Sequence, residues 1–294
     1  MVSQLTVDVV IPTLGRPSLL RAIESVRAQT HGKTRPIVVL DDPSQETYVR
    51  GILDATDLLV VTSGAVGGGS ARNLGLDASS ADLVAFLDDD DWWDDRKLEK
   101  QADAIASANA TVVFTHTVFH ETNGNTRILP EGPFDDSTNI ADYLVVRPRL
   151  RHGHGYMQSS SLLFDRRVHS DIRWDDSLPK HQDWDFVLRL STSPDSVFIF
   201  VEEALVHVQQ GSTGSISKKR TALSSQKWLD KHAALMTHRP RGDFIATQIL
   251  RAHLTNRDIS SALKTCVLLL RERPHLAAVA IGLSGAVESV RRHS

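Results

Sequence analysis

The protein has 294 residues, of which 41% are hydrophobic, enough for one large domain or for an ordinary domain with an appendage. Its 33 basic and 36 acidic residues give a formal net charge of −3, without the basic bias of a general nucleic-acid-binding protein. Cys266 is the only cysteine, which excludes a disulfide scaffold and cysteine-ligated zinc and fits a reducing compartment.

The first half of the chain alternates apolar runs with helical patterns. Residues 5–11 predict a strand that Pro12 stops, and residues 18–29 place apolar side chains at helical spacing. Further strands are expected at residues 36–40, 58–62, 83–87 and 110–116, with helices at residues 70–78 and 95–108. This alternation predicts an α/β fold with a mostly parallel sheet flanked by helices.

After about residue 120 the pattern loosens, and residues 121–139 have the Asn, Gly, Pro and Asp content of a loop. Two more strands are expected at residues 156–164 and 196–201, and a helix at residues 183–190. Helical patterns then dominate, at residues 221–236, 242–255, 259–271 and 276–291. The sequence therefore predicts an α/β domain with a helical C-terminal extension.

Four carboxylates, Asp88, Asp89, Asp90 and Asp91, directly follow the strand expected at residues 83–87. In an open α/β sheet, ligands bind at this end of the strands. Four adjacent negative charges repel one another, and a divalent cation that carries phosphate oxygens would neutralise them. The alternative is a solvated acidic turn in front of a helix.

Polar residues also follow two other strands of the expected sheet, namely Pro12 and Thr13 after the first and Asp41 and Asp42 after the second. Their convergence predicts a crevice of the kind that binds nucleotides. Residues 64–75 form a glycine-rich turn into a helix, whose exposed amides can bind phosphate. The segment is not a Walker motif, and its glycines can equally serve a tight turn.

The order of these segments resembles the family 2 glycosyltransferases, which are inverting, nucleotide-sugar-dependent enzymes of the GT-A (Rossmann-like) fold. The resemblance rests on residues 9–13, 41–42, 71–75 and 86–91, and it continues through residues 92–98 and 182–190. It implies a GT-A catalytic domain over residues 1–215 and leaves residues 216–294 as a helical C-terminal region. Within the domain, residues 1–116 would bind the nucleotide sugar, and residues 117–215 would form the acceptor side.

The acid run matches the DxD motif of this family. By resemblance, Asp90 should hold Mg²⁺ or Mn²⁺ on the donor diphosphate, and Asp88 and Asp89 should lie near the ribose or support the metal. Asp91 is expected only to cap the next helix. His207 is a second candidate for a metal contact, with a structural histidine as the alternative.

Five other residues match donor-binding positions of the family. Asp42 corresponds to the acid that contacts the nucleobase, with Asp41 beside it, and Pro12 and Thr13 correspond to the turn under the base. Arg72 corresponds to a basic position near the nucleotide. The donor would be a UDP-, GDP- or dTDP-sugar.

Asp183 matches the general base of the family. Inversion needs one carboxylate to take the proton of the acceptor hydroxyl on the face opposite the leaving group. The alternative role of Asp183 is a helix N-cap, and Gln182 stands where many members of the family carry Glu. The acceptor site is expected to border His152, His154 and Tyr156, close to Gln158, while residues 211–220 form either a closing loop or a surface linker.

The resemblance thus implies an inverting, metal-dependent glycosyltransferase with a saccharide or glycolipid acceptor, acting in cell-surface polysaccharide or glycolipid synthesis. Two alternatives are a sugar-phosphate nucleotidyltransferase and a non-catalytic nucleotide-sugar-binding protein. No nucleic-acid partner is expected, and a homodimer through the C-terminal helices is an open alternative.

The sequence shows no signal peptide and no run of the roughly 18 apolar residues that a membrane-spanning helix requires. We therefore expect a cytoplasmic protein. Peripheral association with the inner face of the membrane is the alternative, because the C-terminal end is apolar and basic.

Overall fold

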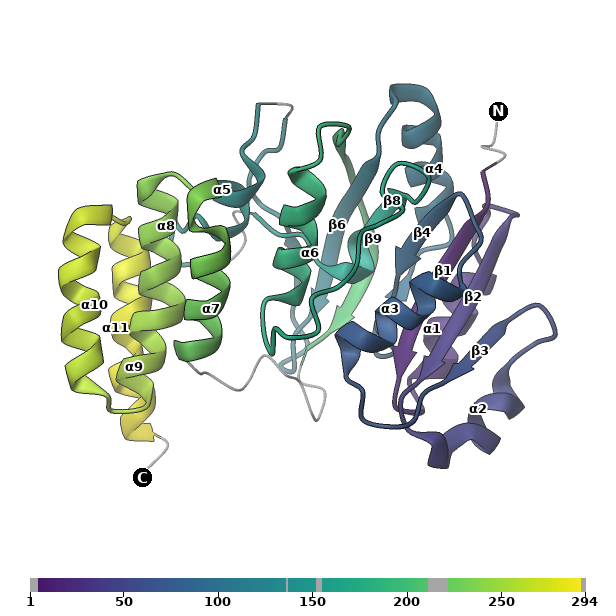
Figure 1. Cartoon of the computed structure of the whole chain (residues 1–294), viewed down its shortest axis with the longest axis horizontal. Coiled ribbons are helices and arrows are strands. Elements are labelled where there is room, and N and C mark those ends of the chain that lie inside the picture. Colours follow the sequence, from purple (N-terminus) through teal and green to yellow (C-terminus); the bar gives the residue numbers. More distant parts are fainter. Residues whose placement is uncertain (1–4, 136, 152–154, 211–221, 292–294) are drawn as a thin grey trace. The chain divides into compact units, whose positions relative to one another are not determined.

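A computed structural model describes residues 5–135, 137–151, 155–210 and 222–291 (Figure 1). The chain divides into two compact units. Unit 1 comprises residues 1–129, 157–177 and 182–213, and unit 2 comprises residues 130–156, 178–181 and 214–294. Unit 2 thus takes two segments from the first two thirds of the chain, and the domain boundary at residue 215 stays a prediction.

Unit 1 contains one sheet, in which the described strands follow the order β3-β2-β1-β4-β8-β6-β9-β5, with β7 paired to β6 (Figure 1). The strands are β1 (Val7–Thr13), β2 (Thr34–Leu40), β3 (Leu58–Val61), β4 (Leu83–Phe86), β5 (Trp92–Trp93), β6 (Val112–His120), β7 (Thr126–Leu129), β8 (Leu163–Asp165) and β9 (Phe198–Gln209). From β3 to β4 all pairs are parallel. β8 then runs antiparallel to both β4 and β6.

The helices of unit 1 are α1 (Leu19–Arg27), α2 (Glu46–Ile52), α3 (Gly68–Ala78), α4 (Lys97–Ala108) and α6 (Gln182–Ser191). Except for α2, which is not predicted from the sequence, these helices lie where the sequence predicts them. The apolar runs that predicted strands supply the core, and Val9 and Ile11 of β1 pack in one buried cluster with Leu19 and Ile23 of α1. The predicted α/β fold is therefore confirmed.

Some predicted elements differ from the structure. β1 runs through Pro12, which pairs in register with Val39 of β2. β4 stops pairing with β1 at Val10, so Pro12 lies where β1 has a neighbour on one side only. Residues 121–139 contain β7, and the strand expected at residues 156–164 is the short helix η2 (Ser159–Ser161) followed by β8.

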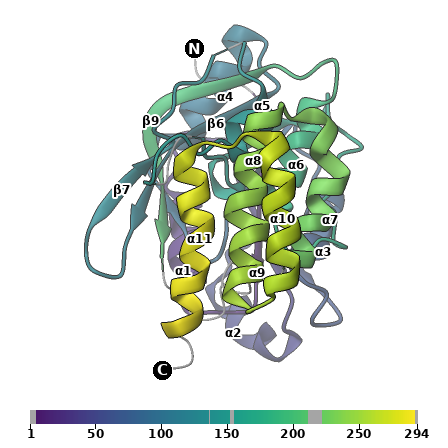
Figure 2. The same cartoon turned by 90° about the vertical axis from the view of Figure 1, so that its left-hand side faces the viewer.

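Unit 2 is helical, and Figure 2 shows α8 to α11 running alongside one another. Its elements are α5 (Ile140–Val145), α7 (Ala222–His232), α8 (His238–Phe244), the π-helical η5 (Ile245–Leu250), α9 (Arg251–Thr255), α10 (Ile259–Glu272) and α11 (Leu276–Arg291). Two glycines of α11 let this helix pack closely against its neighbours. A Cβ on Gly282, for example, would lie 2.7 Å from the carbonyl oxygen of Ala246 in η5. The predicted helical C-terminal region is confirmed.

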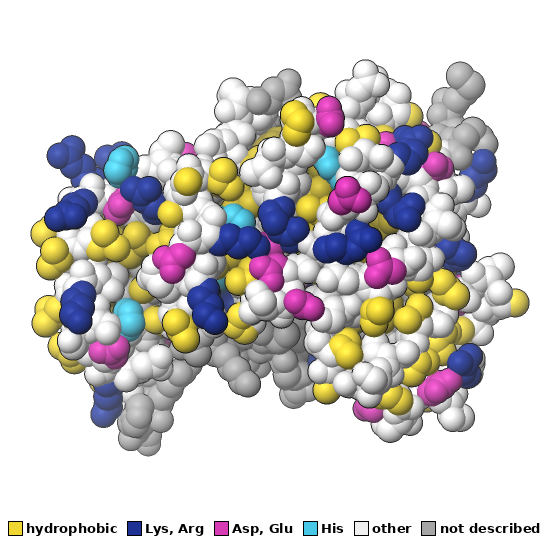
Figure 3. All heavy atoms as spheres, viewed as in Figure 1, with side chains coloured by type: hydrophobic (Ala, Val, Ile, Leu, Met, Phe, Trp, Pro, Cys, Tyr) yellow, Lys and Arg dark blue, Asp and Glu magenta, His cyan; other side chains and the backbone are white. Residues whose placement is uncertain are grey.

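No described helix is long and apolar enough to cross a membrane. Hydrophobic side chains nonetheless reach the surface of unit 2, and Figure 3 shows them over the helices where Figure 1 places α10. Leu263, Val267 and Leu270 of α10 are 62–79% exposed. Charged side chains of both signs are interspersed over the face shown in Figure 3.

Candidate functional site

Residues 88–91 follow β4 and precede β5, at the carboxyl end of the parallel half of the sheet. Asp89 and Asp91 are buried, whereas Asp88 and Asp90 are partly exposed. Successive carboxylates in such a place need partners that offset their mutual repulsion. The partners come from four separate segments of unit 1, and they differ from one acid to the next.

Asp89 is held by the segment around the end of β1. The Thr13 hydroxyl donates to Asp89 Oδ2 at 2.7 Å and accepts the amide of Gly15 at 2.9 Å. Arg16 Nη1 donates to Asp89 Oδ1 at 3.2 Å. Burial raises the pKa of Asp89, and Thr13 and Arg16 oppose the rise. Thr13 and Asp89, both predicted to bind the donor, thus contact each other directly.

Asp88 pairs with Arg72 of α3, whose Nη2 donates to Asp88 Oδ1 at 2.5 Å. Arg72 is buried, and its guanidinium lies 4.7 Å from the ring centroid of Trp174. Burial lowers the pKa of Arg72, but the charges of Asp88 and Asp183 outweigh this and hold it above its usual value. Arg72 Nε has no hydrogen-bond partner within the described segments, so the guanidinium keeps a donor for an oxyanion.

The short helix η2 joins the acids to one another, and its three serines are fully buried. The Asp88 amide donates to Ser160 Oγ at 3.1 Å, and the Ser160 hydroxyl donates to Asp91 Oδ2 at 2.7 Å. Gln158 Nε2 donates to the same oxygen at 3.0 Å. Burial, with the charge of Asp88, raises the pKa of Asp91 well above its usual value.

The prediction that Asp91 caps the following helix is wrong. α4 begins at Lys97, and its N-cap residue is Arg96. An aspartate in front of a helix is typical of a cap, but a carboxylate that is 2% exposed needs buried donors. Those donors come from η2, about 70 residues further along the chain.

Asp183 lies in the first turn of α6 and is partly exposed. The Ser159 amide donates to the Asp183 carboxylate, and the Ser159 hydroxyl donates to Asp88 Oδ1 at 3.4 Å. Burial raises the pKa of Asp183 to about 6, while Arg72 opposes the rise and Asp88 adds to it. One serine therefore contacts both the acid run and the predicted base.

Asp41 organises the glycine-rich turn that leads into α3. Its carboxylate accepts the Thr62 hydroxyl at 2.6 Å and the amides of Val66 and Gly67 at 2.9 Å each. Burial opposes ionisation, but these bonds hold the pKa of Asp41 below its usual value. Gly67 has φ of 89°, in the left-handed region that glycine tolerates best. Both oxygens of Asp41 therefore serve this turn, and its contact with a donor stays a prediction.

Asp42 is placed differently from its neighbour. It is partly exposed and caps the short helix η1 (Pro43–Gln45), accepting the amide and the hydroxyl of Ser44 at 3.1 and 2.7 Å. Both bonds use Oδ1, so the second oxygen can accept a further donor.

Asp90 is the acid of the run with the fewest protein contacts. Its nearest cation is Arg16, 3.8 Å from Oδ2, and its backbone carbonyl accepts Arg21 Nη2 at 3.0 Å. No group of three or more His, Cys, Asp or Glu residues in the described ranges could hold a metal by itself. Mg²⁺ is usually held by one or two carboxylates together with substrate phosphates and water. The carboxylate of Asp90, whose only described ion pair is the long one with Arg16, fits that kind of site.

His207 lies on β9, and its ring stacks on Trp92 with centroids 5.0 Å apart. Its Nδ1 is 3.0 Å from His120 Nε2, and its Nε2 is 3.4 Å from Asp94 Oδ1. A metal would have to displace one of these partners. The metal role of His207 stays a prediction, and the contacts favour the structural alternative.

Ser159, Ser160 and Arg16 belong to the cluster but are not identified by the sequence pattern. A run of serines before a short strand carries no signal, because its role depends on partners about 70 residues away. Other expected residues cannot be placed. His152, His154 and residues 211–220 lie outside the described residues.

Several known proteins are similar to this chain. The family model described as "Glycosyl transferase family 2" matches residues 8–172. The "Amylovoran biosynthesis glycosyltransferase AmsB" of Erwinia amylovora is 23% identical over 266 residues, which cover 86% of this chain and 80% of the relative. The "Succinoglycan biosynthesis protein ExoO" of Rhizobium meliloti is 25% identical over 279 residues, which cover 85% and 77%.

Among solved structures, S. aureus TarS 1-349 in complex with UDP-GlcNAc superimposes with a TM-score of 0.61 at 14% sequence identity. The match covers 98% of this chain and 89% of that chain. At this level of identity the likeness shows the fold, and the expected GT-A fold is confirmed.

Proposed function

This chain belongs to glycosyl transferase family 2, and we propose that unit 1 is an inverting transferase that moves a sugar from a nucleotide-sugar donor to a hydroxyl acceptor. One observation carries the proposal: Ser159 and Arg72 connect the candidate base Asp183 to Asp88 of the acid run. Inversion needs these parts side by side, because the diphosphate departs from one face of the sugar while the acceptor attacks the other.

The nucleotide would lie along the ends of β1 and β2. Asp42 keeps a carboxylate oxygen for an N–H group of the base, and Pro12 and Thr13 would form the turn beneath it. Asp41 would act through the turn before α3, which it shapes with its carboxylate. The UDP-GlcNAc bound by TarS supports a UDP-sugar among the UDP-, GDP- and dTDP-sugar candidates.

The diphosphate would lie against the acid run. Asp90 would hold Mg²⁺ or Mn²⁺, with Asp88 and Asp89 as its supports. When bound, the ion supplies Lewis-acid stabilisation of the charge that develops on the departing diphosphate. Arg16 and Arg72, which contact these acids, add positive charge on the protein side.

Asp183 would take the proton of the acceptor hydroxyl. Its raised pKa, about 6, lies close enough to neutrality for an efficient base that is still ionised at pH 7. Attack opposite the leaving group turns an α-linked donor into a β-linked product. The Ser159 amide would orient the carboxylate for this step.

The two rival functions have weaker support. A nucleotidyltransferase would be expected to carry a glycine-rich Arg/Lys signature after β1, and residues 14–17 are a poor version of it. A non-catalytic binding protein would be expected to lack the base, and Asp183 is present.

Polysaccharide or glycolipid synthesis is the setting that the relatives support, since their names include amylovoran and succinoglycan biosynthesis. A homodimer and a peripheral membrane contact both stay predictions. Leu276, Leu283, Val287 and Val290 of α11 are 52–87% exposed, and their spacing puts them on one helix face. Such a face is typical of either kind of contact.

The direct test is release of nucleoside diphosphate from a panel of UDP-, GDP-, dTDP- and CMP-sugars. We expect one donor class to be turned over in the presence of Mg²⁺ or Mn²⁺, and the same donor to raise the melting temperature by mass action. If no donor were turned over and no donor raised the melting temperature, the proposal would be contradicted.

Removing the Asp90 carboxylate should abolish metal activation. We expect Asp90→Asn to lower the rate of diphosphate release about 100-fold or more, because several kcal/mol of transition-state stabilisation are lost. A titration with Mn²⁺ at fixed donor concentration measures the effect. Asp195→Asn, on an exposed turn after α6, makes the same chemical change as a control and should leave the titration unchanged.

The pH dependence of the reaction should report the base. A general base works when deprotonated, so log kcat/KM should be level near neutral pH and fall with slope 1 below a midpoint near 6. Initial rates between pH 4.5 and 8 give the profile, and donor binding over the same range separates chemistry from binding. A profile with no acid limb above pH 5 would contradict the assignment of Asp183.

A further inference from the structure

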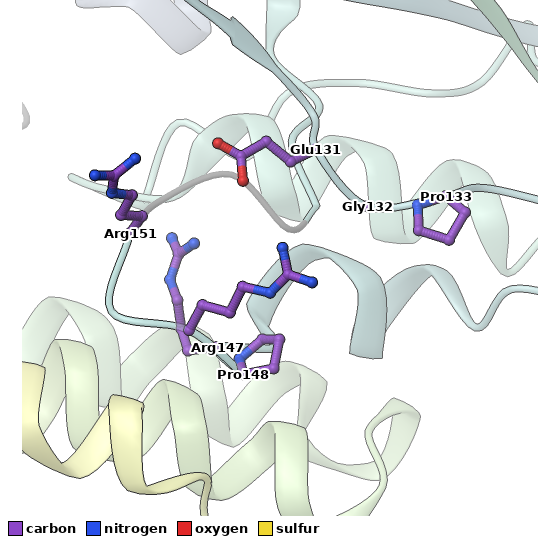
Figure 4. Close-up of a pocket in the computed structure, with 7 residues that line it drawn as sticks. Glu131, Gly132, Pro133, Arg147, Pro148 and Arg151 are labelled. Carbon is purple, nitrogen blue, oxygen red and sulfur yellow. The ribbon is translucent and has the colours of Figure 1, made fainter.

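Unit 2 contains a hollow that the proposed mechanism does not use (Figure 4). One wall is the segment after β7, and the other is the segment after α5. The lining residues are Glu131, Gly132, Pro133, Arg147, Pro148, Arg149 and Arg151. Three guanidinium groups and one carboxylate therefore surround a single hollow.

Both walls are fixed by buried contacts within unit 2. The Tyr143 hydroxyl of α5 donates to the carbonyl oxygen of Gly132 at 3.3 Å. The Arg147 amide donates to Asp243 Oδ2 at 2.7 Å, and Asp243 of α8 is fully buried. Pro133 and Pro148 further restrict the backbone on each side. Each wall is thus anchored within unit 2 at one residue, Gly132 on one side and Arg147 on the other.

Three of the lining residues are arginines and one is a glutamate. Arg149 and Arg151 are exposed, and neither forms an ion pair with a carboxylate in the part of the chain that the structure describes. Figure 4 shows the side chains of Glu131 and Arg151 above those of the other labelled lining residues. Two arginines beside one carboxylate leave positive charge for an external anion.

We infer that this hollow binds a phosphate group. Guanidinium groups offer forked donors that match phosphate oxygens two at a time, and Arg149 and Arg151 can both turn such donors to one phosphate. Glu131 would set the affinity by opposing the anion. The phosphate could be a free ion or part of a phosphorylated acceptor, and the second source rests on the proposed transferase function.

Binding of inorganic phosphate, followed by calorimetry at low salt, tests the site itself. We expect the double variant Arg149→Ala/Arg151→Ala to raise the Kd for phosphate at least about tenfold, and Glu131→Gln to lower it severalfold. The control Lys264→Ala/Arg271→Ala removes the same charge from exposed positions on α10 and should change the Kd less than about twofold. The inference would be overturned if the Arg149/Arg151 variant bound phosphate with the wild-type Kd, or if the control variant lost as much phosphate affinity as the Arg149/Arg151 variant.

Transfer assays distinguish the two sources. If the phosphate belongs to the acceptor, the Arg149/Arg151 variant should raise KM for a phosphorylated acceptor and not for its dephosphorylated analogue, with kcat unchanged. An equal KM for both acceptors together with phosphate binding assigns the site to free phosphate. A wild-type protein that transfers no sugar but binds phosphate in this way would sink the transferase proposal and leave the anion site standing.

Discussion

Asp183→Asn is expected to lower the rate of nucleoside diphosphate release by about 1,000-fold while leaving donor binding intact. The asparagine side chain keeps the size and the hydrogen-bond acceptor of the aspartate but cannot take a proton, and general base catalysis is typically worth 10²–10⁴-fold. Stopped-time rate measurements with a saturating acceptor, paired with calorimetric binding of the donor, give both quantities.

The matched control is Asp195→Asn, which makes the same change on an exposed turn of unit 1 and should keep the wild-type rate. Because Asp183 accepts the Ser159 amide, a purely structural role would lower stability and donor affinity along with the rate. Normal turnover by Asp183→Asn would refute the base assignment. A slow variant that has also lost donor affinity would assign Asp183 to structure instead.

Arg72→Ala is expected to destabilise unit 1 by about 3 kcal/mol or more. Arg72 is buried and pairs with Asp88, and removing one member of a buried pair leaves the other charge uncompensated. Urea unfolding measures the loss. Arg50→Ala breaks the exposed pair with Glu46 and should cost less than about 1 kcal/mol.

The same variant tests the electrostatics of the base. Arg72 opposes the rise in the pKa of Asp183, so its removal should raise that pKa further. The acid limb of the pH–rate profile should then move to higher pH than in the wild type. Arg72→Lys should restore part of the stability, but a lysine cannot reproduce the forked donor. Unchanged stability and an unmoved acid limb would show that Arg72 does not couple these acids.

Long-range contacts explain which parts of the site the sequence could predict. The acid run and the end of β1 were predictable, because apolar strands followed by polar residues place those residues at one edge of a parallel sheet. The pairing of Thr13 with Asp89 was not, since nothing in either segment names its partner. Likewise, the sequence predicts a strand at the serines of η2, and only the structure shows that they contact Asp88 and Asp91.

The secondary structure shows the same contrast between elements with a local sequence signal and elements without one. α10 and α11 were predicted almost to the residue, because their apolar periodicity is local. β5, only two residues long, depends on its antiparallel pairing with β9 and has no periodicity of its own. α2 was missed because it buries a single residue, Val49, and therefore shows no apolar stripe.

The central claim, a nucleotide-sugar diphosphate held at the acid run, is tested most directly by a crystal structure with a nucleoside diphosphate and Mn²⁺. We predict an anomalous Mn²⁺ peak within ligand distance of Asp90, the nucleobase beside Asp42, and the diphosphate between Arg16 and Arg72. A nucleotide bound away from the ends of β1, β2 and β4, or a metal held by His207 without Asp90, would contradict it.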